Sequence, residues 1–416
     1  MIARVADQRV WNSIRWLYTG AGLLFLANIA LGVLNVFTDG DLPRAQLLAH
    51  LHSGTIGWIT LSVIATMFWV FTGDRVVSDK YASFVRTYVI LALLFVPGYV
   101  MAFGLAFSRG LFVLLPIFGI PTVLLIITAL AFSATRLKRL PVVTTVHLLF
   151  VGALTVASLG GIMGAVWGLT YETGAYPYPD REGVEPIGAH AGPMDMYLGL
   201  ALAAMVELMI APAASQRWTK PGLAQTILGV LGAFIISLAL FVGVPQIIPL
   251  SLLCYLVGFG FYFGRVGWRT FKVNPFAPGP AAAQFWGGLS FPAYVITFVL
   301  VVALYFVPGV PPPHAVLIFF AHLGFIGFAT NLLLATQSTF APKAGASPAM
   351  ERAALWTLNI GFFAFMAGEF MSERREGALL MALGAIASLL VVWSRLGRSW
   401  HGPSAEGPPP PAPQAS

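Results

Sequence analysis

The chain alternates between long apolar segments and short polar connections along almost its whole length. An α-helix needs about 20 apolar residues to cross the hydrocarbon core of a bilayer. Twelve segments reach this length, near residues 11–37, 47–72, 84–107, 111–134, 141–168, 189–213, 222–244, 247–267, 287–307, 314–336, 351–371 and 377–396. They leave no room for a soluble domain. The pattern therefore predicts an all-α integral membrane protein, with about twelve transmembrane helices in a single domain over residues 1–400.

Composition supports a membrane location. Hydrophobic residues make up 58% of the chain and charged residues 9%, whereas soluble proteins carry about 25% charged residues. Membrane lipid is therefore the main expected partner. The only cysteine, Cys254, lies inside an apolar segment, which excludes an intrachain disulfide and a thiolate cluster. Residues 401–416 are rich in proline, and we expect them to form a disordered tail.

The basic residues predict an orientation in the membrane. If the N-terminus is cytoplasmic, 18 of the 23 Lys and Arg residues fall on cytoplasmic connections or at cytoplasmic helix ends. Such an excess is typical of the cytoplasmic side. Both termini are then cytoplasmic in a bacterial inner membrane, and the net charge of +7 needs no nucleic-acid partner. The five outer residues are Arg44, Arg109, Arg181, Arg374 and Arg375.

A weak internal repeat divides the chain into three units. His52, His190 and His322 are each followed two residues later by glycine, and they recur at nearly equal intervals, each close to a third of the chain. This spacing predicts three pseudo-repeated arcs of four helices: unit 1 (about 1–140), unit 2 (141–275) and unit 3 (276–400). The three histidines open helices 2, 6 and 10, which all start from the outer face. They are therefore expected at similar depth.

The sequence AHLHSGTIGWI places His50 and His52 at the start of the second apolar segment. Ionisable side chains inside a membrane usually face a cavity, a cofactor or a partner. Successive helical residues turn by about 100°, so these two side chains point to opposite sides and can serve two sites flanking one helix. Neutral imidazole is a good ligand for haem iron or copper. The alternative is that they lie in the headgroup region or at helix starts without a ligand role.

The segment LLAHLHSGTIGWITLSVIATMFW resembles the H-x-H-S-G-x-x-G-W helix of the catalytic subunit of C-family cytochrome oxidases. That subunit belongs to the haem–copper oxidase superfamily, together with nitric oxide reductases. Twelve helices in three four-helix arcs are also the architecture of that superfamily. A looser resemblance is to the NnrS family of twelve-helix membrane proteins, which contain haem and copper and are linked to nitric oxide stress.

The resemblance implies a role for each candidate residue. His52 and His190 would ligate a low-spin haem b. His50 would face the other pore and bind a second haem with one open face, where nitric oxide or oxygen could bind. His322 would be the copper-type or distal ligand there, with His314 nearby. Separately from the resemblance, two outer arginines, Arg44 and Arg181, could pair with haem propionates, but solvated loop charges are the favoured interpretation.

Two departures from the superfamily limit this transfer. The H-x-H helix is the tenth there and the second here. The helix expected to hold an adjacent His-His pair reads LWTLNIGFFAFMAGEF and has no histidine. The sequence thus predicts a b-type haem protein, with one haem or two and without a complete haem–copper centre.

The expected function is electron transfer or nitric oxide or oxygen redox chemistry. The chain could thus be an oxidoreductase, with a redox partner protein or quinol as donor and with additional subunits. The alternatives are copper handling or transport on the same scaffold, and a haem-free relative that acts in assembly.

Other polar residues in the apolar segments have weaker implications. Asp195, Glu207 and Glu369 could relay protons, but satisfied polar contacts are the favoured interpretation. Met194 and Met196 could bind a soft metal, but ordinary packing is favoured. Finally, the spacing of Gly160 and Gly164 is typical of close helix packing.

Overall fold

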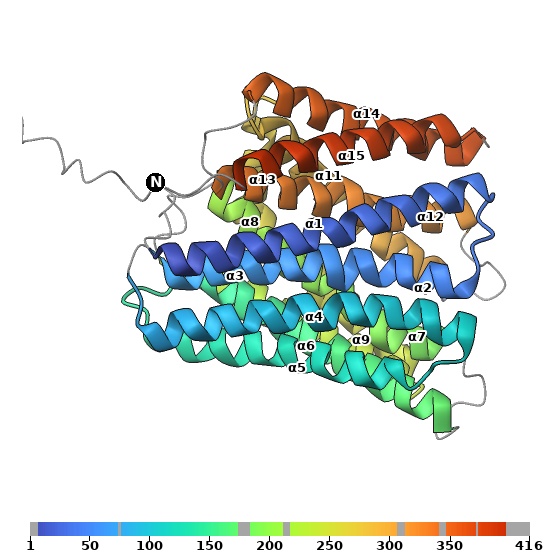
Figure 1. The fold of residues 1–416 in the computed structure, drawn as a ribbon, viewed down its shortest axis with the longest axis horizontal. Coiled ribbons are helices and arrows are strands. Elements are labelled where there is room, and N and C mark those ends of the chain that lie inside the picture. Colours follow the sequence, from blue (N-terminus) through green and yellow to red (C-terminus); the bar gives the residue numbers. More distant parts are fainter. Residues whose placement is uncertain are drawn as a thin grey trace, which may run out of the picture.

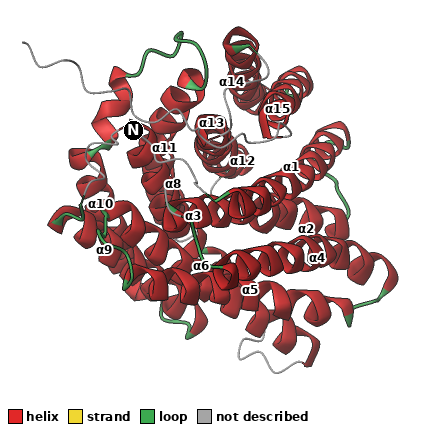
Figure 2. Cartoon of the chain, turned by 60° about the vertical axis from the view of Figure 1, so that its left-hand side comes forward, coloured by secondary structure: helices red, strands yellow, loops and turns green. Residues whose placement is uncertain are grey.

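The computed structural model describes residues 7–73, 76–173, 184–210, 217–305, 313–340, 347–371 and 373–396. Over these ranges the chain is built of helices and contains no strand (Figure 2). Twelve helices there are long and apolar enough to cross a membrane. They coincide with the twelve predicted segments. The predicted tail, residues 401–416, lies outside the described residues.

The twelve spans follow one another along the chain (Figure 1). Unit 1 holds α1 (Gln8–Phe37), then α2 (Arg44–His52), η1 (Ser53–Thr60) and α3 (Leu61–Thr72) as one span, then α4 (Asp79–Arg109) and α5 (Leu114–Leu137). Unit 2 holds α6 (Thr145–Thr173), α7 (Val184–Ala191) with α8 (Pro193–Ile210), α9 (Lys220–Phe241), η3 (Pro245–Ile247) with α10 (Ile248–Arg265), and η4 (Gly267–Lys272). Unit 3 holds α11 (Ala281–Tyr305), then α12 (His314–His322), η5 (Leu323–Thr330) and α13 (Asn331–Phe340) as one span, then α14 (Pro348–Met371) and α15 (Arg375–Leu396).

The second span of each unit lies at the centre of the molecule. Buried residues make up 83, 78 and 56% of the apolar windows of these three spans, compared with 22–50% for the other nine. Polar side chains join them across the centre. Trp58 of η1 donates to Thr330 of η5 (3.1 Å), and Gln337 of α13 donates to Ser62 of α3 (3.3 Å). Each such bond satisfies groups that lipid could not.

All three central spans are interrupted at the same place. Turns of π-helix begin at Ser53, directly after His52, and at Leu323, directly after His322. In unit 2 the break lies at Gly192, and Pro193 is the first residue of α8. The labels α2, α7 and α12 lie at one end of Figure 1 and α3, α8 and α13 at the other. The histidine-bearing segments thus share one end, away from the N-terminus.

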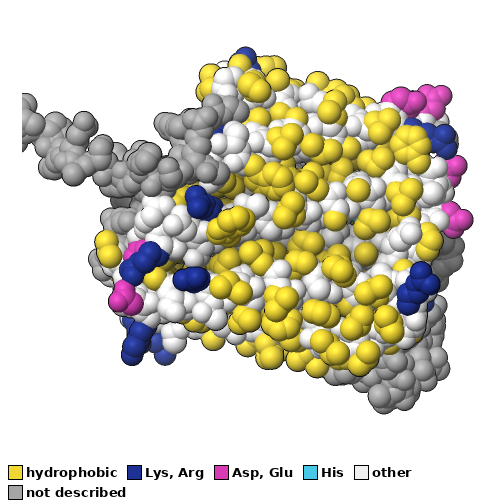
Figure 3. Space-filling model, in the orientation of Figure 1, with side chains coloured by type: hydrophobic (Ala, Val, Ile, Leu, Met, Phe, Trp, Pro, Cys, Tyr) yellow, Lys and Arg dark blue, Asp and Glu magenta, His cyan; other side chains and the backbone are white. Residues whose placement is uncertain are grey.

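The outer spans present an apolar surface to the membrane. Large side chains such as Trp16, Leu124, Leu253 and Leu383 are more than half exposed. In Figure 3, apolar side chains cover the middle of the visible face, and most charged side chains lie toward its two ends. This distribution is typical of a multi-pass membrane protein.

Three arginines repeat the division into units. Arg136, Arg265 and Arg395 lie near the ends of α5, α10 and α15, and the two intervals between them are almost the same. Arg136 reaches the carbonyl of Phe71 (3.5 Å) and lies over the ring of Tyr81. The other two form buried ion pairs with carboxylates: Arg265 with Glu207, and Arg395 with Glu351 (2.8 Å).

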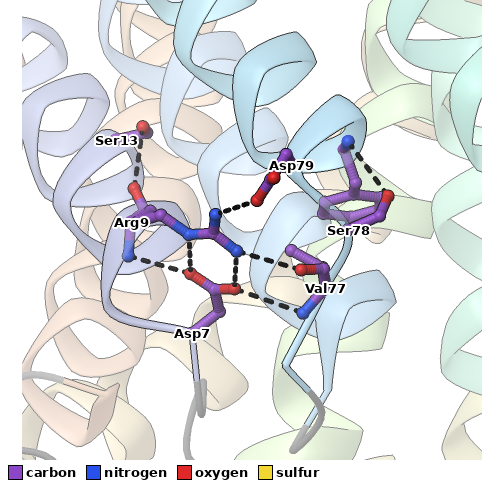
Figure 4. Close-up of polar contacts among 7 residues, drawn as sticks. Asp7, Arg9, Ser13, Val77, Ser78 and Asp79 are labelled. Carbon is purple, nitrogen blue, oxygen red and sulfur yellow. Dashed lines mark hydrogen bonds and ion pairs between the residues drawn. The ribbon is translucent and has the colours of Figure 1, made fainter.

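The start of α1 is fixed to the start of α4 by a small polar network (Figure 4). Asp7 caps α1 by accepting from the backbone of Arg9 (3.0 Å), and it also accepts from the backbone N–H of Val77 (3.2 Å). The Arg9 guanidinium bridges Asp7 (2.8 Å) and Asp79 (2.6 Å). The Arg9 side chain beside Asp7 lowers the pKa of this carboxyl to about 2.

Candidate functional site

His52 and His190 lie side by side in the interior, between units 1 and 2. His52 is the last residue of α2, and His190 lies in the last turn of α7. Their ring centres are 6.4 Å apart and their planes differ by 14°. Phe103 of α4 stacks on His52, with ring centres 4.0 Å apart. The two histidines that the sequence assigns to one site are therefore brought together.

The hydrogen bonds of the two rings fix their tautomer. The Nδ1 atom of His52 lies 2.8 Å from the carbonyl oxygen of Leu48, one turn earlier in α2. The Nδ1 atom of His190 lies 2.7 Å from the carbonyl oxygen of Gly160 in α6. A carbonyl oxygen only accepts, so each Nδ1 carries the proton and donates it. Each Nε2 then holds a free lone pair, as in metal-bound histidines oriented by a backbone carbonyl.

The spacing of the two rings fits ligation of one metal from opposite sides. A metal–imidazole bond of about 2.0–2.1 Å, with about 1.1 Å from the nitrogen to the ring centre, puts two such rings about 6.3 Å apart. The observed separation is 6.4 Å. Two imidazoles on a haem iron satisfy the same geometry, since the porphyrin occupies only the four equatorial positions. The ring separation is therefore compatible with both imidazoles binding one metal ion or one haem iron.

Two glycines of α6 make room for His190. A Cβ added to Gly164 would lie 2.6 Å from the ring of His190, and one added to Gly160 would lie 3.3 Å from its carbonyl oxygen. The Gly160–Gly164 spacing was visible in the sequence as helix packing alone. The structure adds that these glycines receive the candidate ligand itself. In the sequence, the only sign of this role was that the two glycines lie in the helix just before the one that carries His190.

His50 and His322 form a second pair, on the other side of α2. Both line a cavity of 140 Å³ between units 3 and 1. The Nδ1 atom of His322 lies 2.9 Å from the carbonyl oxygen of Ile318, one turn earlier in α12. The Nδ1 atom of His50 lies 3.0 Å from the carbonyl oxygen of Asn28 in α1. His322 therefore also donates from Nδ1. The Nδ1 atom of His50 lies 3.2 Å from the side-chain amide nitrogen of Asn28 as well, so both rings bond to the protein through Nδ1.

The two pairs show that the repeat register must be shifted in unit 2. His190 bonds through Nδ1 to Gly160 in the first helix of its unit, as His50 bonds through Nδ1 to Asn28 in the first helix of unit 1. His190 thus corresponds to His50, and not to His52 as the glycine spacing suggested. The helix breaks agree, since Ser53, Pro193 and Leu323 then occupy equivalent positions. The corresponding triplets are His50-Leu51-His52, His190-Ala191-Gly192 and Phe320-Ala321-His322.

The region between units 2 and 3, called here the third interface, therefore carries neither histidine. Gly192 stands in the place of His52, and Phe320 in the place of His50. The Phe320 ring stacks on Tyr294 of α11, with ring centres 5.1 Å apart, and packs against Phe298. The Tyr294 hydroxyl donates to buried Asp195. Aromatic packing and one hydrogen bond thus replace the ligand pair.

The remaining predicted residues are His314, Arg44 and Arg181. His314 is the first residue of α12, eight residues before His322, and its side chain lies outside the described part of the structure. The Arg44 guanidinium lies over the ring of Phe107, 5.1 Å from its centre. Arg181 lies outside the described residues.

The other candidate polar groups have structural partners. Glu207 pairs with Arg265, and Glu369 accepts from Arg374 (3.1 Å). With Asp195 bonded to Tyr294, all three acids agree with the favoured interpretation of satisfied contacts. Met196 is fully buried. His147 differs from the four interior histidines, because its Nδ1 accepts from the backbone N–H of Thr144 (3.1 Å).

Across the ranges that the structure describes, no group of three or more His, Cys, Asp or Glu side chains could hold a metal ion. Each candidate site there offers two imidazoles. The chain matches no model of a known protein family, and no curated protein matches it.

Proposed function

We propose that this chain is a b-type haem protein of the membrane that transfers electrons, with a haem held between His52 and His190. The observation that carries the proposal is the pair of near-parallel rings, 6.4 Å apart, each with Nδ1 bonded to a backbone carbonyl. A bound haem would supply a one-electron iron couple. With both axial positions taken by imidazole, the iron has no open position for a gas.

A haem suits this pair better than a single ion does. Zinc and copper sites usually need three or four protein ligands. The described residues offer two at this place, and a porphyrin supplies the other four. This favours haem binding over the copper-handling alternative.

The chain's own residues would hold the ligands in place. The carbonyls of Leu48 and Gly160 orient the two imidazoles, and Gly164 leaves the space that His190 occupies. The stacked ring of Phe103 covers one side of His52. Fixed rings keep the ligation unchanged between oxidation states, which reduces the reorganisation that an electron transfer requires.

We also propose a relationship to the catalytic subunits of haem–copper oxidases, without their copper centre. The H-x-H motif, the twelve spans and the two pairs flanking α2 support it. On this proposal the protein lies in a bacterial inner membrane with both termini cytoplasmic. Its electron donor would be a quinol or a redox protein.

Spectra of the protein purified after haem-replete expression test the proposal. We expect a Soret band, a b-type reduced-minus-oxidised spectrum, and a low-spin signal of two axial histidines. His52→Ala and His190→Ala should each remove the low-spin signal of the haem at this pair. The matched control is His147→Ala, because this histidine is also buried but has the opposite tautomer.

Protein without haem would contradict the proposal. Copper bound in place of haem would favour the alternative of metal handling. A haem content and low-spin spectrum that are unchanged in both His52→Ala and His190→Ala would place the haem elsewhere.

A further inference from the structure

The His50–His322 pair is built on the same plan as the His52–His190 pair. In each, one ring donates from Nδ1 to the carbonyl four residues earlier in its own helix: His52 to Leu48, and His322 to Ile318. The other ring bonds through Nδ1 to the first helix of its own unit. His190 donates to the carbonyl of Gly160, and His50 contacts the carbonyl oxygen (3.0 Å) and the amide nitrogen (3.2 Å) of Asn28. Each pair therefore combines one histidine that is oriented by its own helix with one that is oriented by the first helix of its unit.

Glycine makes room for the ring in both sites. A Cβ on Gly32 of α1 would lie 3.1 Å from the His50 ring, as one on Gly164 would crowd His190. Gly32 lies one helical turn after Asn28, just as Gly164 lies one helical turn after Gly160. The agreement extends from the ligands to the groups that orient them.

The cavity between the two rings is large and apolar. Its volume of 140 Å³ is roughly ten times what one water molecule needs. Apart from the histidines and Asn28, its lining is apolar and includes Phe25, Phe325 and Phe365. The cavity suits a flat, apolar ligand with a metal at its centre, because only two protein ligands are available.

We infer that His50 and His322 bind a second haem from opposite sides, which closes its iron to gases. This rests on the proposed function, and it departs from the expected site on His50 with one open face. His322 is thereby assigned as the second axial ligand of this iron. The third interface has no equivalent site, because Gly192 and Phe320 stand there in place of the two histidines.

The experiment is a haem count with ligand binding on the purified full chain. We expect two haems per chain by pyridine haemochrome assay, two low-spin signals in the electron paramagnetic resonance spectrum, and no carbon monoxide binding after reduction. In His322→Ala, one low-spin signal should disappear and the reduced protein should bind one equivalent of carbon monoxide. The signal of the His52–His190 haem should remain, and His147→Ala should change nothing.

Each other outcome has a separate meaning. One haem, lost in His52→Ala, would overturn this inference and leave the proposed function intact. Two haems with carbon monoxide binding to the unsubstituted protein would also overturn it, because the second iron would then be open. This result needs no variant and does not depend on the folding of His322→Ala. No haem at all would remove the proposed function.

Discussion

The His52–His190 site and the third interface occupy equivalent places in the molecule, and they differ in what fills them. The first holds two imidazoles with free Nε2 atoms, and the second holds the Phe320–Tyr294 stack and the Tyr294–Asp195 hydrogen bond. The helices around them follow the same order. Two positions, 192 and 320, thus separate a candidate cofactor site from a packing contact.

The difference shows that the same arrangement of helices can lack a histidine pair and still keep a packed interior. At Gly192 a Cβ would lie 2.6 Å from the carbonyl oxygen of Gly188, so the backbone there has no space for the histidine that unit 1 carries. At position 320, phenylalanine keeps the ring and removes both nitrogens. Packing is preserved while ligation is removed.

The largest loss of unfolding free energy is expected when Arg265 is replaced. Its partner, Glu207, lies in α8. Arg265→Ala leaves the carboxylate of Glu207 buried without its ion pair, which should cost about 3–5 kcal/mol of unfolding free energy. Arg136→Ala is the matched control, because Arg136 reaches only a carbonyl and a ring. Denaturant unfolding in detergent measures both. Equal losses would show that the ion pair does not stabilise unit 2.

The next largest effect is on haem affinity, and it is expected only at the His52–His190 site. Gly164→Ala places a methyl group 2.6 Å from the His190 ring, so the ring must move. Haem affinity at His52–His190 should fall about 10- to 100-fold, as for other changes that displace an oriented ligand. Gly168→Ala, on the same helix with open space around it, should bind haem normally. Haem titration of the apoprotein compares them, and unchanged affinity in Gly164→Ala would contradict the site.

A smaller effect is expected in the third interface. Tyr294→Phe removes the hydrogen bond to buried Asp195, which should cost about 1–2 kcal/mol. The haem spectrum should not change, because neither residue contacts the histidine pairs. Thermal unfolding and an absorption spectrum of the same sample check both statements. A shifted Soret band would mean that this interface is part of a cofactor site.

The smallest change in stability is expected at the Asp7–Arg9 network, which lies far from both regions, and it depends on pH. The pKa of Asp7 is lowered to about 2 by Arg9, so its contribution is present above pH 4 and is lost as the pH falls from about 4 to 2. Because Arg9 is half exposed, this contribution should be about 1 kcal/mol. Asp7→Asn should remove this part of the acid dependence in unfolding curves recorded from pH 5 to 2. A curve that keeps the same slope would show that the network does not stabilise α1.

The twelve spans could be predicted from the sequence because a bilayer imposes a minimum apolar length. The pairing of His52 with His190 was expected only from the resemblance. The 100° helical rotation predicts that His50 and His52 point to opposite sides of one helix. The register of unit 2 was predicted wrongly, since glycine after histidine is a local signal. What fixes the register is a hydrogen bond to α6, 30 residues away.

Tautomers could not be predicted at all. Whether Nδ1 donates or accepts depends on the backbone atom opposite it, which differs between His190 and His147. The role of Gly164 was likewise hidden, because the sequence does not show which side chain faces a glycine.

The contact between α1 and α15 has a consequence for biogenesis. The groups that contact the His52 and His190 rings, such as Leu48, Phe103, Gly160 and Gly164, all precede α8 in the sequence. The cavity beside His50 also needs Ala378, Met381 and Ala385 of the last helix. The contacts of the His52 and His190 rings can therefore form before α15 is made. The cavity beside His50 is closed only when α15 packs against α1.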